Sequence, residues 1–225
     1  MKLQLSTRLQ TIASRIPEGS TLCDVGCDHG YLPIWAVSEG VCQKAYALDV
    51  RKGPLERAAQ HVAEAGLEDR IILRLSDGLD EMHPGEADVI VISGMGGPLM
   101  EDILTRGADI AQKARCLVLS PQSHLMEFRS FLCREGYHII SEDCLEDEGK
   151  HYFVMTVEHR DGKHMELSEF ELRYGLAEPE KLAGYLKAEK KRLTAIRDNL
   201  LKNSPQDVRL KEIDNELMIL LTFLP

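Results

Sequence analysis

The stretch TLCDVGCDHGY, residues 21–31, decides the fold. Its first half is a short apolar run, and Gly26 closes that run in a tight turn. This pattern predicts a buried strand that enters a glycine-rich turn and is followed by a helix beginning near Tyr31. Asp24 and Asp28 stand in or beside the turn, where the backbone can come close to a bound ligand.

The rest of the first 160 residues repeats the same order of strand and helix. Short apolar runs alternate with longer amphipathic segments five times, and the polar turn EDEGK joins two final runs. Such alternation predicts an α/β fold of the Rossmann-like type, with mostly parallel strands, helices on both faces and a terminal antiparallel hairpin. The strands are expected at 21–26, 44–50, 71–77, 87–93 and 115–121, the helices at 3–15, 31–39, 53–66, 96–107 and 123–135, and the hairpin at 137–158.

Beyond residue 160 the pattern becomes helical. Two long amphipathic segments are separated only by a break at Ser204 and Pro205. We expect helices over 167–203 and 206–223, paired as an antiparallel hairpin because the break is short. The sequence thus predicts two domains, a Rossmann-like domain at 1–160 and a C-terminal α-helical hairpin at 161–225.

Composition narrows the class of protein. The 225 residues are 44% hydrophobic and 28% charged, and no apolar run reaches the roughly 18–20 residues of a membrane span. The N-terminus lacks an apolar signal block, so the expected compartment is the cytoplasm. None of the six cysteines forms a CxxC pair, so we expect no metal site. The oligomeric state stays open between a monomer and a weak dimer.

Acidic side chains follow successive strands, where a ligand of this fold would lie. A dinucleotide needs small uncharged residues around its pyrophosphate, whereas Asp24 and Asp28 suit a cationic ligand such as S-adenosylmethionine, which carries a sulfonium and an ammonium group. Asp49 is placed to accept hydrogen bonds from ribose hydroxyls, and Asp77, followed by Gly78, from the adenine amine. Each residue is also compatible with a turn or a helix cap, so spacing alone indicates only a nucleoside-binding α/β domain.

A glycine-rich loop follows the fourth predicted strand. The loop Ser93-Gly94-Met95-Gly96-Gly97 holds three glycines in five residues, which predicts open space above the sheet for the reactive end of the ligand. Amino-methyltransferases usually carry an Asn/Asp-Pro-Pro-Tyr type of loop here, whose aromatic ring stacks the target base. That loop is absent, so the residues that stack the base stay unassigned.

In order and spacing, the motifs resemble those of the bacterial tRNA (adenine(22)-N(1))-methyltransferases: DVGCDHGYLP, ALDVRKGPLERA, SDGL, ISGMGG and LVLSPQ. The resemblance covers the whole chain and implies a class I methyltransferase, S-adenosylmethionine as cofactor and tRNA as substrate. LSPQ stands where the family often has LQPN, which weakens any amide role for Gln122. The residues then expected to contact or frame the cofactor are Asp24, Gly26, Asp28, His29, Asp49, Val50, Asp77, Gly78, Ser93, Gly94, Met95, Gly96 and Gly97.

The expected chemistry needs few protein groups. Adenine N1 has a free lone pair, so direct attack on the methyl group depends on positioning more than on a strong base. The methylated base is cationic, and Asp28 is the first catalytic candidate because a carboxylate would stabilise that charge. His29 is the second, as an acid or base near neutral pH, although a neutral His29 that only supports the turn fits equally well. Tyr31 is expected to pack rather than to stack a base.

Basic residues on the C-terminal helices and near the cleft are candidates for RNA contact. The net charge of −10 counts against a nucleic-acid partner, but a local basic surface can act within an acidic protein. Acidic residues interleave with the basic ones, so a solvated helical face is the alternative. The residues expected to contact tRNA are Arg8, Arg51, Lys52, Lys187, Lys190, Lys191, Arg192 and Arg197, with Lys181 and Lys202 on the same stripe.

The sequence leaves three other functions open. A methyltransferase of the same fold that acts on a small molecule or a protein would suit the acidic net charge. A non-catalytic module would use the helical hairpin to bind a partner, but the intact series of acids at the strand ends argues against it. An NAD(P) oxidoreductase needs GxGxxG, whereas this turn has only GxxxG.

Overall fold

The computed structural model describes residues 3–224, which form two compact units divided between Glu166 and Leu167. The first unit contains the sheet, and the second is helical. Among residues 3–224, no helix combines the length and apolar character needed to span a lipid bilayer.

Within the described chain, a seven-stranded sheet organises the first unit in the order β3-β2-β1-β4-β5-β7-β6. Strands β1 to β5 run parallel, whereas β7 pairs antiparallel with both β5 and β6, so the predicted sheet with a terminal hairpin is confirmed. The strand order reverses between β1 and β4, which makes their carboxyl ends the switch point of the sheet. The strands are β1 (Ser20–Val25), β2 (Cys42–Asp49), β3 (Ile71–Leu75), β4 (Val89–Ser93), β5 (Cys116–Ser120), β6 (Tyr137–Asp147) and β7 (Lys150–His159).

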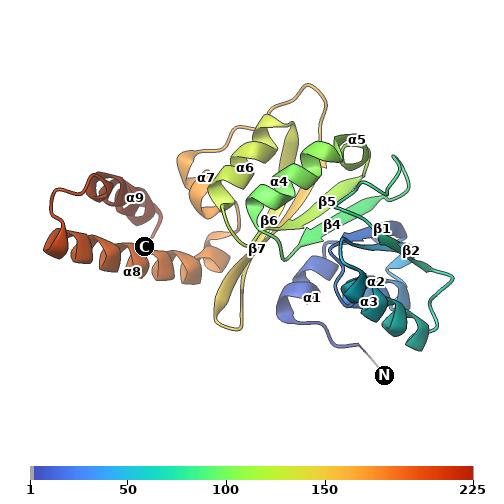
Figure 1. The fold of residues 1–225 in the computed structure, drawn as a ribbon. Helices are drawn as coiled ribbons and strands as arrows, with labels where there is room; N and C mark the ends of the chain where they lie inside the picture. The colour runs from blue at the N-terminus through green and yellow to red at the C-terminus, as the bar shows by residue number, and fades with distance from the viewer. Residues whose placement is uncertain (1–2, 225) are drawn as a thin grey trace. The chain divides into compact units, whose positions relative to one another are not determined.

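Helices cover both faces of this sheet, and the core lies between the layers. Every residue of β4 from Val89 to Ile92 is fully buried, as expected for a central parallel strand with helices on either side. Figure 1 shows helices on both faces of the sheet. One face carries α1 (Thr7–Ala13), α2 (Tyr31–Ser38) and α3 (Lys52–Glu64), and the other carries α4 (Gly97–Arg106), α5 (Ala108–Ala111) and α6 (Leu125–Arg134).

The first helix is shorter than the predicted 3–15. It begins after Ser6, whose hydroxyl accepts a hydrogen bond from the backbone N–H of Leu9 and so caps the helix. The helix contacts β6 and β7, and an ion pair between Arg15 and Asp143 joins it to the hairpin. The α1 helix is therefore fixed to the end of the sheet rather than to its middle.

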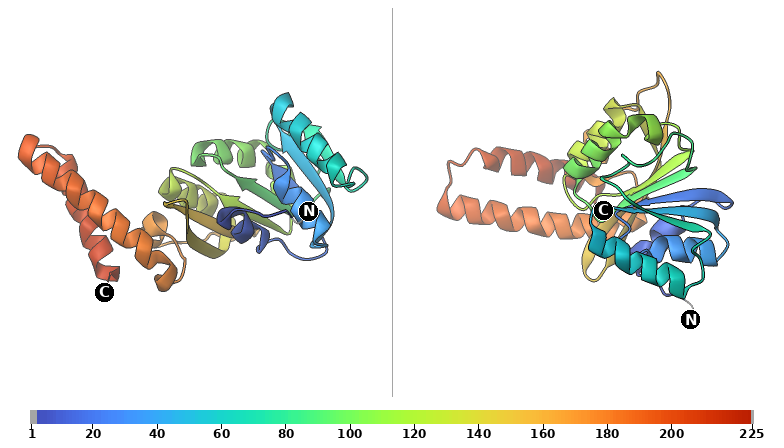
Figure 2. Two further views of the ribbon diagram at one scale, coloured as in Figure 1. Left: turned by 90° about the horizontal axis from the view of Figure 1, so that it is seen from below. Right: turned by 45° about the vertical axis from the view of Figure 1, so that its right-hand side comes forward.

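The second unit comprises α7 (Glu169–Tyr174), α8 (Pro179–Asn203) and α9 (Arg209–Phe223) in the described chain. The single helix expected over 167–203 is interrupted, because Gly175 ends α7 with a φ of 95° and Pro179 begins a new helix. The α8 and α9 helices lie side by side and run in opposite directions (Figure 2). Their buried contacts come from Leu186, Leu193, Leu200, Leu210, Ile213 and Leu220.

Candidate active site

A cleft of about 540 Å³ opens at the carboxyl ends of β1 to β4, beside the switch point of the sheet. Its volume lies within the roughly 300–1,000 Å³ that is usual for small-ligand sites. Parallel strands end at the same edge of a sheet, and this edge brings together residues that are far apart in sequence. The sequence-predicted cofactor residues that line the cleft are Asp24, Gly26, Asp28, His29, Asp49, Val50, Asp77, Gly78, Ser93, Gly94 and Met95.

Asp24 lies inside the cleft at the end of β1 and is only 5% exposed. Burial raises the pKa of Asp24 from 3.8 to about 7, the negative charge of Asp49 adds to the rise, and the positive charge of Arg8 opposes it. The carboxylate form is therefore poorly stabilised by the protein itself. A cationic ligand in the cleft would supply the missing positive charge.

Asp49 ends β2 with both carboxylate oxygens held by backbone groups. Its Oδ1 accepts the N–H of Arg51 at 2.9 Å, and its Oδ2 accepts the N–H of Asp28 at 3.3 Å. A carboxylate oxygen accepts more than one hydrogen bond, so each oxygen keeps a lone pair for a ligand. This oriented, buried carboxylate can accept hydrogen bonds from the two neighbouring hydroxyls of a ribose.

Asp28 and His29 form part of the cleft lining near its exposed rim. Asp28 has a φ of 48°, in the left-handed region that residues with a side chain rarely adopt, and its carboxylate is more than half exposed. Its two oxygens lie 3.4 Å from His29 Nε2 and 3.7 Å from Arg57 Nη2. Backbone strain beneath an exposed carboxylate is typical of functional sites.

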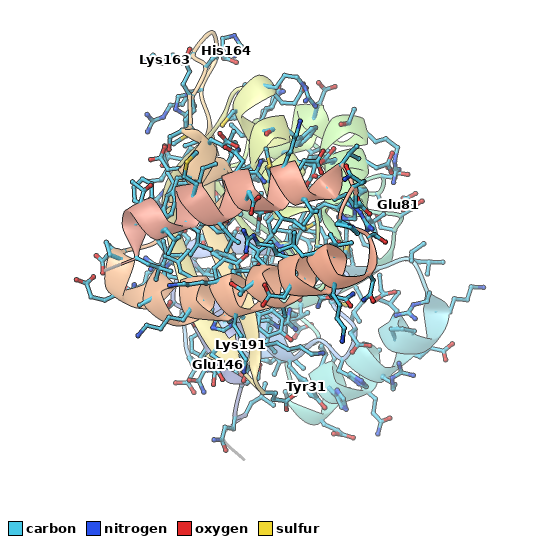
Figure 3. All side chains as sticks on the ribbon, turned by 90° about the vertical axis from the view of Figure 1, so that its left-hand side faces the viewer. Tyr31, Glu81, Glu146, Lys163, His164 and Lys191 are labelled. Carbon is cyan, nitrogen blue, oxygen red and sulfur yellow. The ribbon has the colours of Figure 1, made fainter. Side chains whose placement is uncertain are left out.

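An aromatic cluster borders this acid. The ring of Tyr31, which is 39% exposed and labelled in Figure 3, stacks on His29 with a centroid separation of 5.5 Å and on His61 at 5.2 Å. The Nδ1 atom of His61 lies 2.9 Å from the carbonyl oxygen of His29, which fixes the position of His61 against the turn. Tyr31 thus stacks on two histidine rings of the protein while it also lines the cleft.

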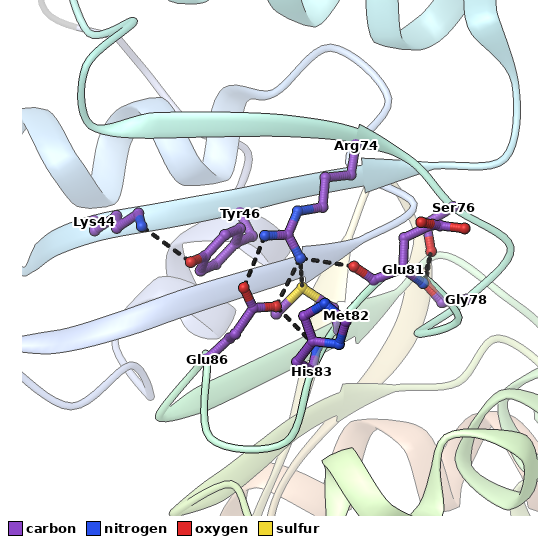
Figure 4. Close-up of polar contacts among 9 residues, drawn as sticks. All are labelled: Lys44, Tyr46, Arg74, Ser76, Gly78, Glu81, Met82, His83 and Glu86. Atoms are coloured by element: carbon purple, nitrogen blue, oxygen red, sulfur yellow. Dashed lines mark hydrogen bonds and ion pairs between the residues drawn. The ribbon is translucent and has the colours of Figure 1, made fainter.

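Arg74 holds the loop that carries Asp77 into the cleft. Its guanidinium binds Glu86 bidentately at 2.7 and 2.8 Å and donates a third hydrogen bond to the carbonyl oxygen of Glu81 at 2.7 Å (Figure 4). The hydrogen bond from Arg74 lowers the pKa of Glu86 to about 2, so the pair stays ionised at neutral pH. The loop between β3 and β4 is therefore anchored in the part that leads into β4.

Arg106 of α4 anchors the part of the same loop that directly follows β3. It donates to Asp77 Oδ1 at 3.1 Å, to Asp80 Oδ1 at 2.6 Å and to Asp102 Oδ2 at 3.0 Å. Asp77 therefore lies in the cleft with one oxygen already engaged, and its other oxygen can accept a ligand amine.

The glycine loop after β4 departs from the prediction. Of its three glycines, Gly94, with a φ of 79°, borders the cleft, whereas Gly96 and Gly97 do not line it. A Cβ atom at Gly97 would lie 2.8 Å from the carbonyl oxygen of Ser123, and one at Gly96 would lie 2.9 Å from the Ser123 hydroxyl. These two glycines permit close packing of neighbouring backbones rather than opening space for a ligand.

Several lining residues were not predicted as cofactor contacts. Leu99 and Ile103 of α4 form an apolar wall, and Gln122 follows β5. The spacing of Leu99 and Ile103 by four residues directly after the glycine loop is a helical signal that would have found this wall. Among the residues expected to contact RNA, Arg8 and Arg51 line the cleft and Lys52 does not.

S-adenosylmethionine fits this set of residues. Its positively charged sulfonium and ammonium groups match the buried carboxylate of Asp24, its ribose matches Asp49, and Asp77 and the apolar wall suit its adenine. Burial raises the pKa of the Cys27 thiol, so Cys27 does not offer a competing thiolate nucleophile. In the described part of the chain, no group of three or more His, Cys, Asp or Glu residues could hold a metal ion.

Fold and site together define a class I, S-adenosylmethionine-dependent methyltransferase. A family model described as a methyltransferase domain matches residues 5–155. The chain is 41% identical to the tRNA (adenine(22)-N(1))-methyltransferase of Bacillus subtilis over 160 residues, which cover 71% of this chain and 67% of the relative. The chain belongs to the tRNA (adenine(22)-N(1))-methyltransferase family.

Solved structures agree over nearly the full length. The B. subtilis tRNA methyltransferase TrmK matches with a TM-score of 0.80 and 30% identity, covering 99% of this chain and 100% of that chain. The TrmK of M. capricolum in complex with S-adenosylhomocysteine matches with a TM-score of 0.83 and 25% identity over 97% of each chain. The likeness therefore extends through the C-terminal helices.

Proposed function

We propose that this protein transfers the methyl group of S-adenosylmethionine to N1 of an adenine in tRNA, the adenine at position 22. The observation that carries the proposal is the 41% identity with the B. subtilis enzyme of that name. The carboxylates at the ends of successive strands supply the matching cofactor site. Together these observations favour tRNA over a metabolite or protein substrate, and catalysis over an inert binding module.

The residues of the cleft have separate tasks in this reaction. S-adenosylmethionine, when bound, supplies a methyl group attached to a positively charged sulfur. Asp24, Asp49 and Asp77 bind and orient the cofactor, and adenine N1 attacks with its own lone pair, so the protein has to align the base rather than deprotonate it. Asp28, at the exposed rim, stabilises the positive charge that develops on the base.

Two substitutions separate the charge of Asp28 from its backbone conformation. We expect Asp28→Asn to lower kcat for tRNA methylation by about 10²–10³, the usual effect of losing one electrostatic contact to a transition state, with a much smaller loss of cofactor affinity. Asp28→Gly should lose the same activity but unfold at a higher temperature, because glycine adopts a φ of 48° without strain. Steady-state rates and thermal unfolding measure both effects. Full turnover in the two variants would remove Asp28 from the mechanism.

Unpaired lysines on α8 are the proposed contacts to the tRNA backbone. Lys187, Lys190 and Lys191 are not buried (Lys191 is labelled in Figure 3) and form no ion pair with any residue that the structure describes. The two arginines of the predicted stripe are engaged, Arg192 with Glu189 at 2.7 Å and Arg197 with Asp214 at 2.5 Å. Contacts of the lysines with phosphates would offset the few kcal/mol required to unstack a base inside a folded tRNA.

Reversing the charge of Lys187 and Lys191 tests this surface. Because the two side chains lie one helical turn apart, the double change to Glu should weaken tRNA binding about tenfold or more and flatten its dependence on salt. Filter binding at several salt concentrations gives both quantities. The matched control changes Lys113 and Lys163, which are exposed and outside the stripe, to Glu with the same change in net charge. Equal losses of tRNA affinity in the two variants would mean that net charge, and not contact with the stripe, explains the effect.

The substrate is tested with tRNA transcripts that carry adenine or guanine at position 22. With labelled cofactor, we expect methyl transfer only to the adenine transcript. Equal labelling of both transcripts would contradict the assigned position, and labelling of a metabolite or protein panel instead would contradict the substrate class.

We place the reaction in the cytoplasm, where tRNA is found. We also propose that the protein is a monomer or a weak dimer.

A further inference from the structure

Two arginines line the acidic cleft, and one of them, Arg8, carries a buried nitrogen. Arg8 of α1 lines the cleft, and its Nη1 atom is buried with no hydrogen-bond partner among the described residues. A buried donor without a partner is costly, so such atoms are usually satisfied by a ligand or by water. The second arginine of the lining, Arg51, differs because its side chain is 72% exposed.

The position of Arg8 is fixed by the hairpin of β6 and β7. Its backbone N–H donates to Asp147 Oδ2 at 3.1 Å, and its guanidinium carbon lies 5.4 Å from the centroid of the Tyr152 ring. The ion pair between Arg15 and Asp143 holds the other end of α1 to the same hairpin. The guanidinium is therefore preorganised, and a ligand that it binds does not have to order a mobile side chain.

Space for such a ligand lies beside Gly94. A Cβ atom at Gly94 would be 3.7 Å from Arg8 Nη1 and 3.9 Å from Gln122 Nε2, so two nitrogen donors border the same point. Gly94 has no side chain to fill that point. The arrangement suits a small anion with two acceptor oxygens.

The charges of the cleft define what this anion belongs to. Asp24, Asp28, Asp49 and Asp77 favour a ligand with positive charge, whereas Arg8 favours a negative group on that ligand. An RNA phosphate does not meet this description, because Nη1 of Arg8 is buried away from the surface that a polyanion would approach. A zwitterionic amino-acid group attached to a nucleoside meets it.

We propose that Arg8, supported by Gln122, binds the carboxylate of the cofactor's amino-acid group and so makes the cleft select nucleosides that carry this group. The inference rests on the proposed function, because it takes S-adenosylmethionine as the cofactor. It assigns to Arg8 a role inside the cofactor site in place of the RNA contact expected from the sequence.

The test compares two ligands on the full-length protein. S-adenosylhomocysteine carries the amino acid, whereas 5′-methylthioadenosine keeps the nucleoside and the sulfur but lacks the amino acid. Calorimetry should show that Arg8→Met lowers the affinity for S-adenosylhomocysteine about tenfold to a hundredfold. The affinity for 5′-methylthioadenosine should stay within about threefold of wild type. Arg8→Lys should recover part of the loss because it keeps the charge.

Arg15→Met is the matched control, since it removes the other arginine that fixes α1 without touching the cleft lining. It should leave the ratio of the two affinities unchanged. Equal weakening of both ligands by Arg8→Met, no weakening of either, or a loss confined to tRNA binding would each overturn the inference. If the wild-type protein fails to bind S-adenosylhomocysteine at all, the proposed function itself fails.

Discussion

Replacing Asp24 with asparagine is expected to stabilise the free protein at pH 8. Folding raises the pKa of Asp24 from 3.8 to about 7 because the carboxyl is buried, so the folded protein keeps a proton that the unfolded chain releases between these pH values. The free energy of unfolding therefore falls as the pH rises from 3.8 to about 7. Above this range the buried, ionised carboxylate destabilises the folded protein by about 4 kcal/mol. Asparagine avoids this cost, so the melting temperature at pH 8 should rise by roughly 5–15 °C.

The control for this prediction is the same pair of proteins at pH 5. Asp24 is then protonated in the folded wild type, so most of the difference in melting temperature should vanish. An equal gain at both pH values would mean that packing, not charge, explains the change.

The same substitution should lower the affinity for the cofactor. The neutral amide of the variant would not offer a negative charge to the sulfonium and ammonium groups, and loss of a charged contact commonly costs tenfold to a hundredfold in affinity. In the wild type, a cationic ligand binds best to ionised Asp24, so affinity should rise as the pH increases from 6 to 8. Calorimetry across this range should find a flat profile in Asp24→Asn. A flat wild-type profile would contradict the role of Asp24.

Arg129→Met is expected to destabilise the protein by about 3–5 kcal/mol. Arg129 of α6 and Glu142 of β6 have fully buried side chains, with Nη2 and Oε1 2.7 Å apart, and the guanidinium carbon lies 4.9 Å from the centroid of the Phe153 ring. Removing the arginine takes a positive charge away from a carboxylate that stays buried in the core, which costs far more than the pair itself contributes. Urea unfolding at pH 7 measures the loss.

The double variant with methionine at both positions supplies the control. Because neither charge remains buried, it should recover much of the stability that Arg129→Met loses. If the two single losses simply add in the double variant, the coupling between Arg129 and Glu142 is absent and the explanation is wrong.

The strands and the acids at their ends could be predicted because local sequence determines both. An apolar run bounded by glycine or aspartate reads as a buried strand, and parallel strands necessarily bring their ends to one edge. Asp24, Asp49 and Asp77 therefore converge in the cleft as expected. The break between α7 and α8 had a signal as well, in Gly175 and Pro179, but leucine periodicity on either side concealed it.

Tertiary packing explains what sequence alone did not reveal. Arg8 looks like an exposed basic residue on an amphipathic helix until the hairpin of β6 and β7 is seen to hold it against the cleft. Gly96 and Gly97 look like part of a ligand loop until the segment at Ser123 is seen to pack against them. In both cases the partner lies far along the chain, and no local pattern specifies that contact.

The most direct measurement is mass spectrometry of the nucleosides of tRNA incubated with the wild-type protein and S-adenosylmethionine. We expect 1-methyladenosine to appear in proportion to the cofactor consumed, and to be lost when the accepting adenine is replaced. Unmodified nucleosides alongside cofactor turnover on another acceptor, or a methyl group at a different atom of the base, would contradict the account.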